Sequence, residues 1–308
     1  MPLAPEYLAM FEQLAQQDPA PPIYELSTED ARALYRGMRP VVAELPVHAH
    51  KDLTIAGSQG EIPIRIYTPE GDGPFGILVN FHGGGWVIGD LDTADAICRQ
   101  MATLAGVIVV SVDYRMAPEA PYPAAVIDAY EATQWVADHM NELNGNGKLG
   151  VTGESAGGNL AAVVSLKARD TGGPKINFQC LLYPVTDCDL ERPSYRDNGE
   201  GYILETKTMQ WFWDSYCPNP TQRGDAYASP LRAEDLSHLP PALIITAEFD
   251  PLRDEGAAYG DALDAAGTEA TVLMCEGLVH DFMAMAAVFE CAKAPLQTTI
   301  SALKQHLN

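Results

Sequence analysis

Ser155 stands at the centre of a Gly-x-Ser-x-Gly sequence that spans residues 153–157. The apolar run 149–151 precedes it and the apolar segment 160–164 follows, so the pattern predicts a strand, a sharp turn and a buried helix, with Ser155 at the apex of the turn. Glycines on both sides leave room for close backbone packing. The first N–H groups of the helix favour negative charge near the serine. This arrangement indicates a serine nucleophile, although a tight turn that serves only packing has the same short pattern.

A serine nucleophile needs a base that takes its proton and a carboxylate that orients the base. Among the seven histidines, His280 is the candidate base, because it follows the last strand-like run and precedes a helix-like segment. Asp250 is the candidate acid, because it follows the apolar run 242–247 in the same way. Residues that follow parallel strands gather at one edge of the sheet, so we expect Ser155, Asp250 and His280 to meet there.

Three other acidic residues compete with Asp250 for the orienting role: Glu248, Asp254 and Asp281. Each of them also fits a helix cap or a surface charge. The order serine, aspartate, histidine along the chain is typical of α/β-hydrolases and differs from the two other well-known triad orders.

A glycine-rich loop, Phe81–Trp86, follows another apolar run. Consecutive glycines allow backbone N–H groups to approach a ligand closely, so Gly84 and Gly85, together with the N–H of Ala156, are the predicted oxyanion-hole donors. The glycine spacing matches neither common phosphate-binding loop, and no basic residue is near, which argues against a nucleotide site. We expect His82 to brace this loop. The sequence has no HExxH, CxxC or carboxylate cluster, so no metal and no cofactor is expected.

The chain of 308 residues carries 42 acidic and 19 basic side chains, with a formal net charge of −23. Nucleic-acid and anionic-membrane binding need a basic surface, so both are excluded as functions. We interpret the acidity as a solubilising surface; a saline or cold habitat is an alternative that composition leaves open. No apolar run reaches the roughly 20 residues of a membrane-spanning helix.

Six cysteines occur without a CxxC pair or regular spacing, and the first residues lack a basic region followed by an apolar one. Scattered thiols in a chain of this size indicate reduced cysteines, so we expect a cytoplasmic protein. A mature chain whose signal peptide had been removed would look the same.

The order of apolar runs predicts an α/β fold with eight strands. Six continuous apolar strands alternate with helix-like segments, which indicates parallel strands buried on both faces: 76–81, 107–112, 149–153, 180–183, 242–246 and 270–275. The helix-like segments are 94–104, 124–140, 156–168, 255–265 and a last one from about 295. Two earlier runs, 52–55 and 62–67, flank a turn and predict an antiparallel pair.

Two segments stand outside this alternation, and the first fits either amphipathic helices packed on the core or part of a lid. Residues 1–45 read as helical, and 187–229 form a polar, turn-rich insertion between two strands. The core is therefore expected in two parts, 46–186 and 230–308. The insertion contains the aromatic run 208–216, which fits either cap core or the wall of an acyl pocket. Candidate substrate-binding residues are Trp86, Met209 and Trp213.

Five segments together resemble the hormone-sensitive lipase family, and most closely its bacterial carboxylesterase branch, family IV. They are HGGGW at 82–86, DYRMAPE at 113–119 with YPAA at 122–125, GESAGGN at 153–159, DPLRDEG at 250–256, and Gly277-x-x-His280-x-Phe282. The match runs from about residue 40 to the end of the chain. Glu154 is a departure, because many relatives carry aspartate there, and it has no assigned role.

The resemblance implies an α/β-hydrolase core with a mostly parallel sheet, covered by a helical cap that is built from the N-terminal segment 1–45 and the insertion 187–229. It also implies hydrolysis of short- to medium-chain acyl esters through an acyl-enzyme, with Ser155 as nucleophile, His280 as base and Asp250 as its orienting acid. The expected partner is a small ester substrate. A homodimer formed near residues 271–276 is a further expectation from the family.

Three alternative functions use the same residues. Amide hydrolysis or acyl transfer to an alcohol would need the same serine, histidine and acid. A ligand-binding receptor on a hydrolase fold would normally lack an intact triad. An interfacial lipase would need a long apolar lid, which the acidic composition does not favour.

Overall fold

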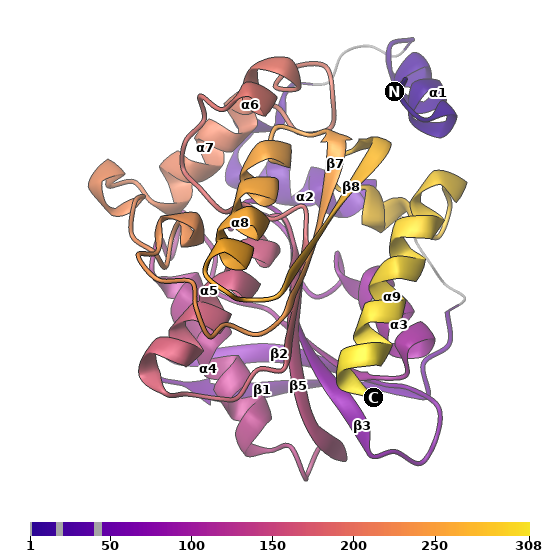
Figure 1. The fold of residues 1–308 in the computed structure, drawn as a ribbon. Coiled ribbons are helices and arrows are strands. Elements are labelled where there is room, and N and C mark those ends of the chain that lie inside the picture. Colours follow the sequence, from indigo (N-terminus) through magenta and orange to yellow (C-terminus); the bar gives the residue numbers. More distant parts are fainter. Residues whose placement is uncertain (1, 17–20, 40–44) are drawn as a thin grey trace.

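A computed structural model describes residues 2–16, 21–39 and 45–308, and its centre is one twisted β-sheet with helices on both faces (Figure 1). The sheet has eight strands in the order β1-β2-β4-β3-β5-β6-β7-β8. The strands are β1 (Ala49–Gly57), β2 (Gly60–Thr68), β3 (Phe75–Phe81), β4 (Ile108–Val112), β5 (Gly145–Glu154), β6 (Phe178–Leu182), β7 (Ala242–Phe249) and β8 (Ala270–Val279). The predicted α/β class with eight strands is confirmed.

Strand pairing follows the predicted division of the sheet. β1 pairs with β2, and β2 with β4, in antiparallel fashion, whereas every other neighbouring pair is parallel. β4 and β6 are buried at every residue, the polar Ser111 and Gln179 included, as expected for strands with helices on both faces of the sheet. β1 lies at the edge of the sheet and is mostly exposed, in keeping with its polar composition.

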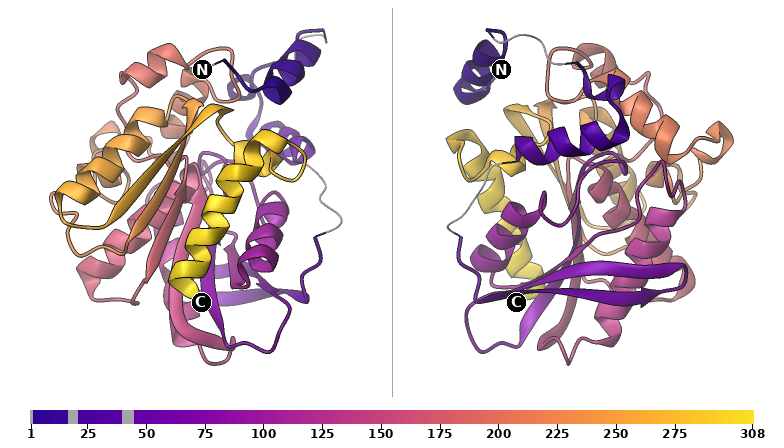
Figure 2. Two further views of the ribbon diagram at one scale, coloured as in Figure 1. Left: turned by 45° about the vertical axis from the view of Figure 1, so that its right-hand side comes forward. Right: turned by 180° about the vertical axis from the view of Figure 1, so that it is seen from behind.

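Helices cover both faces of the sheet and its carboxyl edge. The described α-helices are α1 (Pro5–Leu14), α2 (Thr28–Met38), α3 (Asp95–Ala105), α4 (Ala124–Asp138), α5 (Ala156–Thr171), α6 (Pro193–Asp197), α7 (Thr206–Tyr216), α8 (Arg253–Ala265) and α9 (Lys293–Leu307). α3 and α9 lie on one face, and α4, α5 and α8 on the other (Figures 1 and 2). α2, α6 and α7 lie at the end of the sheet where the parallel strands finish (Figure 2). No helix of the described ranges has the length and apolarity needed to cross a membrane.

β7 and β8 extend beyond their predicted ends at 246 and 275. Their apolar runs stop there, but the two strands continue to pair, past a register shift, up to Phe249 opposite Val279. The extension contains polar residues and a glycine, so a prediction based on apolar runs ends both strands too early. The consequence is functional: Asp250 and His280 each directly follow one member of that last pair, so the two side chains start from neighbouring positions.

The segments predicted as a cap are 1–45 and 187–229, and the two helices of the first segment lie in different places. α2 lies over the carboxyl edge, and its N-cap is Ser27, whose hydroxyl oxygen accepts a hydrogen bond from the backbone N–H of Asp30. α1 packs to one side, where Tyr7 contacts the ring of Phe289 edge-on. Residues 1, 17–20 and 40–44 of the predicted segment 1–45 lie outside the described residues. The insertion 187–229 contains α6 and α7.

Candidate active site

Ser155 lies at a sharp turn between β5 and α5. Its backbone has φ 56° and ψ −116°, a conformation that non-glycine residues rarely adopt. Glycine is required on both sides: a Cβ at Gly157 would lie 1.9 Å from the carbonyl oxygen of Phe81, and a Cβ at Gly153 would lie 2.3 Å from the carbonyl carbon of Gly157. The close packing that the Gly-x-Ser-x-Gly pattern predicts is therefore present, and it fixes where the serine hydroxyl points.

The structure brings the three residues of the predicted triad into one hydrogen-bonded chain. Nε2 of His280 lies 3.0 Å from Oγ of Ser155, and Nδ1 of His280 lies 2.8 Å from Oδ2 of Asp250. The other carboxylate oxygen of Asp250 accepts the backbone N–H of Leu252 at 2.9 Å. Asp250 is fully buried, whereas 7% of His280 and 8% of Ser155 remain exposed. A substrate can therefore reach the serine and histidine but not the aspartate.

The environment of His280 favours its charged form. Burial alone would lower the pKa of the imidazole, but the charge of Asp250 and its hydrogen bond raise the pKa above the ordinary value, with smaller contributions from Asp281 and Glu154. An imidazole with a raised pKa accepts the serine proton more readily.

The three competing acids make other contacts. Glu248 accepts the backbone N–H of Gly277 at 2.7 Å, and Asp254 accepts that of Ser194 at 2.9 Å. Asp281 pairs with Arg39 at 2.8 Å. Only Asp250 of the four has a hydrogen bond to His280 among the described residues.

The glycine loop after β3 lies beside Ser155, because β3 pairs with β5 up to Phe81 opposite Gly153. Gly84 and Gly85 have φ values of 112° and 58°, and their missing side chains leave space that Ile88 and Phe212 fill. Within the described chain, the N–H groups of Gly84, Gly85 and Ala156 donate no hydrogen bond. Three free donors beside a serine hydroxyl are what an oxyanion hole requires.

His82 lies beneath this loop and is almost completely buried. Its ring stacks on that of Tyr114, with centroids 4.2 Å apart, and the Tyr114 hydroxyl donates to the His82 carbonyl at 2.8 Å. Burial lowers the pKa of His82 to about 4, so its imidazole is neutral at physiological pH. These contacts suit the bracing role that the sequence predicted.

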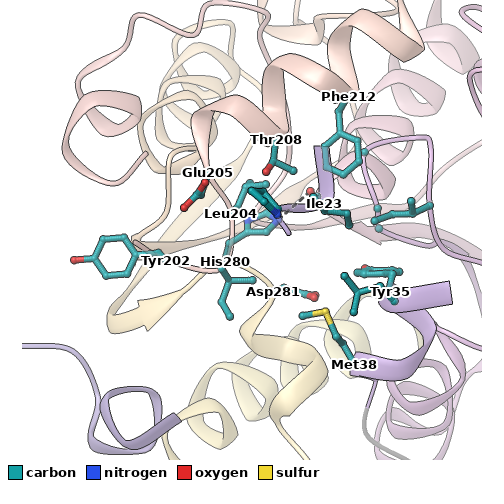
Figure 3. Close-up of a pocket in the computed structure, with 18 residues that line it drawn as sticks. Ile23, Tyr35, Met38, Tyr202, Leu204, Glu205, Thr208, Phe212, His280 and Asp281 are labelled. Atoms are coloured by element: carbon teal, nitrogen blue, oxygen red, sulfur yellow. Dashed lines mark hydrogen bonds between the residues drawn. The ribbon is translucent and has the colours of Figure 1, made fainter. Parts of the chain in front are cut away.

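Ser155 and His280 line a cavity of about 390 Å³ (Figure 3). Its wall is built by the glycine loop, by α2 with the residues before it, and by the insertion. The side chains from α2, from the residues before it and from the insertion are mostly apolar, and they include Ile23, Tyr35, Met38, Leu204, Thr208 and Phe212. Sequence reasoning did not select these residues; the signal that could have found those of α2 is the helical spacing of its apolar residues Ala31, Leu34, Tyr35 and Met38.

The predicted substrate-binding residues Trp86, Met209 and Trp213 do not line this cavity. All three are buried in the core, and the Trp86 ring stacks on Tyr216 with centroids 4.0 Å apart. The reason is the rotation of α7. Thr208 and Phe212 are four residues apart and face the cavity, whereas Met209 and Trp213, one position further on, face the core. The cavity-facing positions of α7 are therefore Thr208 and Phe212, and Met209 and Trp213 lie on its core face.

Glu154, which had no assigned role, is buried directly before the serine. Its Oε1 accepts a hydrogen bond from the Tyr183 hydroxyl at 2.8 Å. Burial raises the pKa of the Glu154 carboxyl, and Asp281 raises it further, whereas Arg39 and the Tyr183 hydrogen bond lower it. Glu154 therefore belongs to a group of charges around His280 that also includes Asp281 and Arg39.

Comparison with known proteins shows which family the chain belongs to. Residues 78–284 match the family model described as the alpha/beta hydrolase fold. Esterase LipI of Mycobacterium tuberculosis is 43% identical over 291 residues, which cover 91% of this chain and 90% of that protein. An ethyl acetate hydrolase of Pseudomonas putida is 35% identical and covers 98% of this chain and 97% of its own length.

Solved structures agree. A thermostable esterase from Pseudomonas putida superposes with a TM-score of 0.95 at 41% identity, covering 100% of this chain and 98% of its own. With the eight-stranded sheet, the glycine loop and the serine turn, these matches establish that the chain belongs to the α/β-hydrolase fold family, in the carboxylesterase branch that resembles hormone-sensitive lipase.

Proposed function

We propose that the protein is a serine carboxylesterase that hydrolyses short- to medium-chain acyl esters through an acyl-enzyme intermediate. The observation that carries the proposal is the hydrogen-bonded chain from Ser155 through His280 to Asp250, with Ser155 and His280 at the surface of an apolar cavity. The named esterases among the relatives support it.

In the first half-reaction, His280 takes the hydroxyl proton of Ser155 while Oγ attacks the ester carbonyl carbon. The negative charge that develops on the carbonyl oxygen is stabilised by the N–H groups of Gly84, Gly85 and Ala156. The tetrahedral intermediate collapses, the bond to the alcohol oxygen breaks, and His280 donates the proton to that oxygen. The products of this step are the free alcohol and an acyl-serine.

Water completes the reaction. His280 takes a proton from a water molecule, the hydroxide attacks the acyl-serine, and the serine leaves with the proton from His280. Asp250 keeps the Nδ1–H of the imidazole directed toward itself and stabilises the imidazolium in both steps. None of these steps needs a cofactor.

The size of the cavity supports small substrates. At about 390 Å³ it lies near the lower end of the roughly 300–1,000 Å³ typical of small-molecule sites. Residues of α2 and of the insertion build much of its wall, so we propose that these two segments act as the cap that covers the acyl group. Six cysteines without a disulfide suit the cytoplasmic location that we propose.

We also propose that two copies pair through β8. This strand forms one edge of the sheet, and Val272 and Met274 on it are 38% and 41% exposed. An exposed apolar edge strand is a template for pairing with another chain. Sedimentation equilibrium of the wild type and of Val272→Lys tests this proposal: a monomeric wild type would contradict it.

The test of the esterase proposal is turnover of p-nitrophenyl esters of increasing acyl length by the wild type and by Ser155→Ala and His280→Ala. We expect each substitution to lower kcat by roughly 10⁴- to 10⁶-fold. Ser301→Ala, on the exposed side of α9, and His48→Ala, on the surface, are matched controls that should keep full activity. Undiminished turnover by either triad variant would overturn the assignment.

The rival functions give other results. A wild type that binds the esters without hydrolysing them would favour a receptor. Faster turnover of matched p-nitroanilides would favour an amidase, and product esters formed with added alcohols would favour a transferase.

A further inference from the structure

Three arginines on α2 and at its end attach this helix to the core, and each meets a different carboxylate. Arg32 pairs with Glu119 at 2.7 Å and also donates to the carbonyl oxygen of Val87 at 2.8 Å. Arg36 pairs with Asp90. Arg39, the residue after the helix, pairs with Asp281 at 2.8 Å. The third pair differs from the others, because Asp281 directly follows His280.

Arg39 lies deep for a residue of the N-terminal segment, with only 10% of its side chain exposed. Its guanidinium stacks 4.3 Å from the ring centre of Tyr35 and donates to that hydroxyl. Arg39 and Glu154 also border one small cavity of about 20 Å³. Asp281 and Tyr35 both line the main cavity, on the side where α2 carries Met38 (Figure 3). Arg39 therefore pairs with Asp281 at the wall of the substrate cavity and acts electrostatically on Glu154, which borders the same small cavity.

The charged and titratable groups around His280 come from every element packed against it. They are Asp250 after β7, Asp281 after β8, Glu154 at the end of β5, Tyr183 after β6, His82 in the glycine loop, Arg39 and Tyr35 from the N-terminal segment, and Glu205 from the insertion. Tyr183 and His82 are neutral at physiological pH, because burial raises the pKa of the former and lowers that of the latter. Arg39 is the one cation in this group.

We propose that Arg39 is a positioning residue of the active site, which neutralises Asp281 and Glu154 beside His280 and so couples the seating of α2 on the core to the base strength of that histidine. Only the predicted change in the pH dependence of kcat/KM rests on the proposed function. The effect of Arg39 on the pKa of His280 comes from the charges around the imidazole, whether or not the chain hydrolyses esters.

The direction of the effect follows from the charges. Without Arg39, Asp281 is unpaired, and an uncompensated carboxylate next to His280 favours the imidazolium. His280 then loses its proton only at higher pH, so the acidic limb of the kcat/KM profile moves to higher pH, by about one pH unit. Glu154 offsets part of this shift if it takes up a proton. A residue that served only to hold α2 in place would lower activity without moving this limb.

The experiment compares four variants of the full chain. They are Arg39→Met, Arg39→Lys, the double variant that combines Arg39→Met and Asp281→Asn, and the control Arg32→Met. Arg39→Met should move the acidic limb to higher pH, Arg39→Lys should move it less, and the double variant should return it toward the wild-type position. Arg32→Met breaks the pair with Glu119, a carboxylate that, unlike Asp281, does not contribute to the raised pKa of His280, so the acidic limb of this variant should stay in place.

A second readout does not depend on turnover. A ¹H–¹³C NMR titration with ¹³C at the histidine Cε1 gives the His280 midpoint directly, and the signal missing in His280→Ala assigns it. If the wild type failed to hydrolyse esters, the proposed function would fall, but this titration would still decide the inference. An unchanged His280 midpoint in Arg39→Met, or an equal shift in Arg32→Met, would overturn it.

Arg39→Met could fail to fold, in which case Asp281→Asn alone carries the test. That variant keeps Arg39 and removes a negative charge beside the imidazole, so the His280 midpoint should fall. A midpoint that rises or stays constant would overturn the inference.

Discussion

Oγ of Ser155 lies 3.0 Å from Nε2 of His280, although 125 positions separate the two residues in the chain. Two features of the sheet bring them together. β5 and β8 are parallel members of one sheet and end at the same edge, and the serine turn directs Oγ across that edge. The last pair of β7 and β8, Phe249 opposite Val279, sets Asp250 behind the imidazole. The triad geometry thus depends on strand register.

The raised pKa of His280 predicts the acidic limb of the pH profile. The imidazole must be neutral to accept the serine proton, so kcat/KM should fall as pH drops through its pKa, with a midpoint above 6.5. Asp250→Asn removes the main cause of the upward shift, so its midpoint should lie lower and its kcat should fall by about 10⁴-fold. The measurement is kcat/KM for one p-nitrophenyl ester against pH. A wild-type midpoint below 6.5 would contradict the prediction.

Gly85→Ala tests the oxyanion loop. A Cβ at this position would lie 2.1 Å from the ring of Phe212, and the backbone has φ 58°, so the loop must move and displace its N–H groups. We expect kcat to fall by about 10²- to 10³-fold, as for the loss of one oxyanion donor. Gly172→Ala is the matched control, because Gly172 has φ 62° but open space around it. This control should cost about 1 kcal/mol of stability and leave kcat unchanged. Equal kinetic losses in both variants would argue against the role of the loop.

The two faces of α7 predict different effects for neighbouring substitutions. Phe212→Ala removes a ring from the cavity wall and so enlarges the cavity, and the preferred acyl chain should become longer. Met209→Ala removes a core side chain, so it should lower the free energy of unfolding by about 2–5 kcal/mol and leave the preferred chain length unchanged. Urea unfolding and kcat/KM across an ester series measure the two effects. A change of chain-length preference in Met209→Ala alone would reverse our assignment of the faces.

The same helix shows where sequence reasoning ended. The triad candidates and the glycine loop could be selected because each follows an apolar strand, and parallel strands end at a common edge. α7 has large apolar side chains on two adjacent faces, so periodicity alone could not decide which face meets the cavity. Tertiary packing decides it: the rings of Trp86, Trp213 and Tyr216 form one buried group.

The pair of Arg39 and Asp281 was hidden for a related reason. Asp281 looked like a surface charge, because nothing in the local sequence states that a residue 242 positions earlier folds back over it. The extended ends of β7 and β8 were missed because polar residues interrupt their apolar runs, while backbone pairing continues regardless of side-chain type.

Glu255 makes a last prediction, on stability. Its carboxyl is fully buried, and Oε1 accepts the N–H groups of Thr186 at 2.8 Å and Asp187 at 3.3 Å. Burial raises the pKa of Glu255 from 4.5 to about 8. The folded state therefore binds this proton more tightly than the unfolded state does. The resulting stabilisation is complete below pH 4.5 and is lost as the pH rises through about 8.

Glu255→Gln keeps an oxygen that can accept both N–H groups, but it cannot ionise. The free energy of unfolding of this variant, relative to the wild type, should therefore increase with pH and level off above about 8. Urea unfolding of both proteins at a series of pH values measures the difference, and Glu12→Gln on the exposed side of α1 should change it little. A difference that is constant across this range, or that falls with pH, would show that Glu255 is not protonated in the folded state.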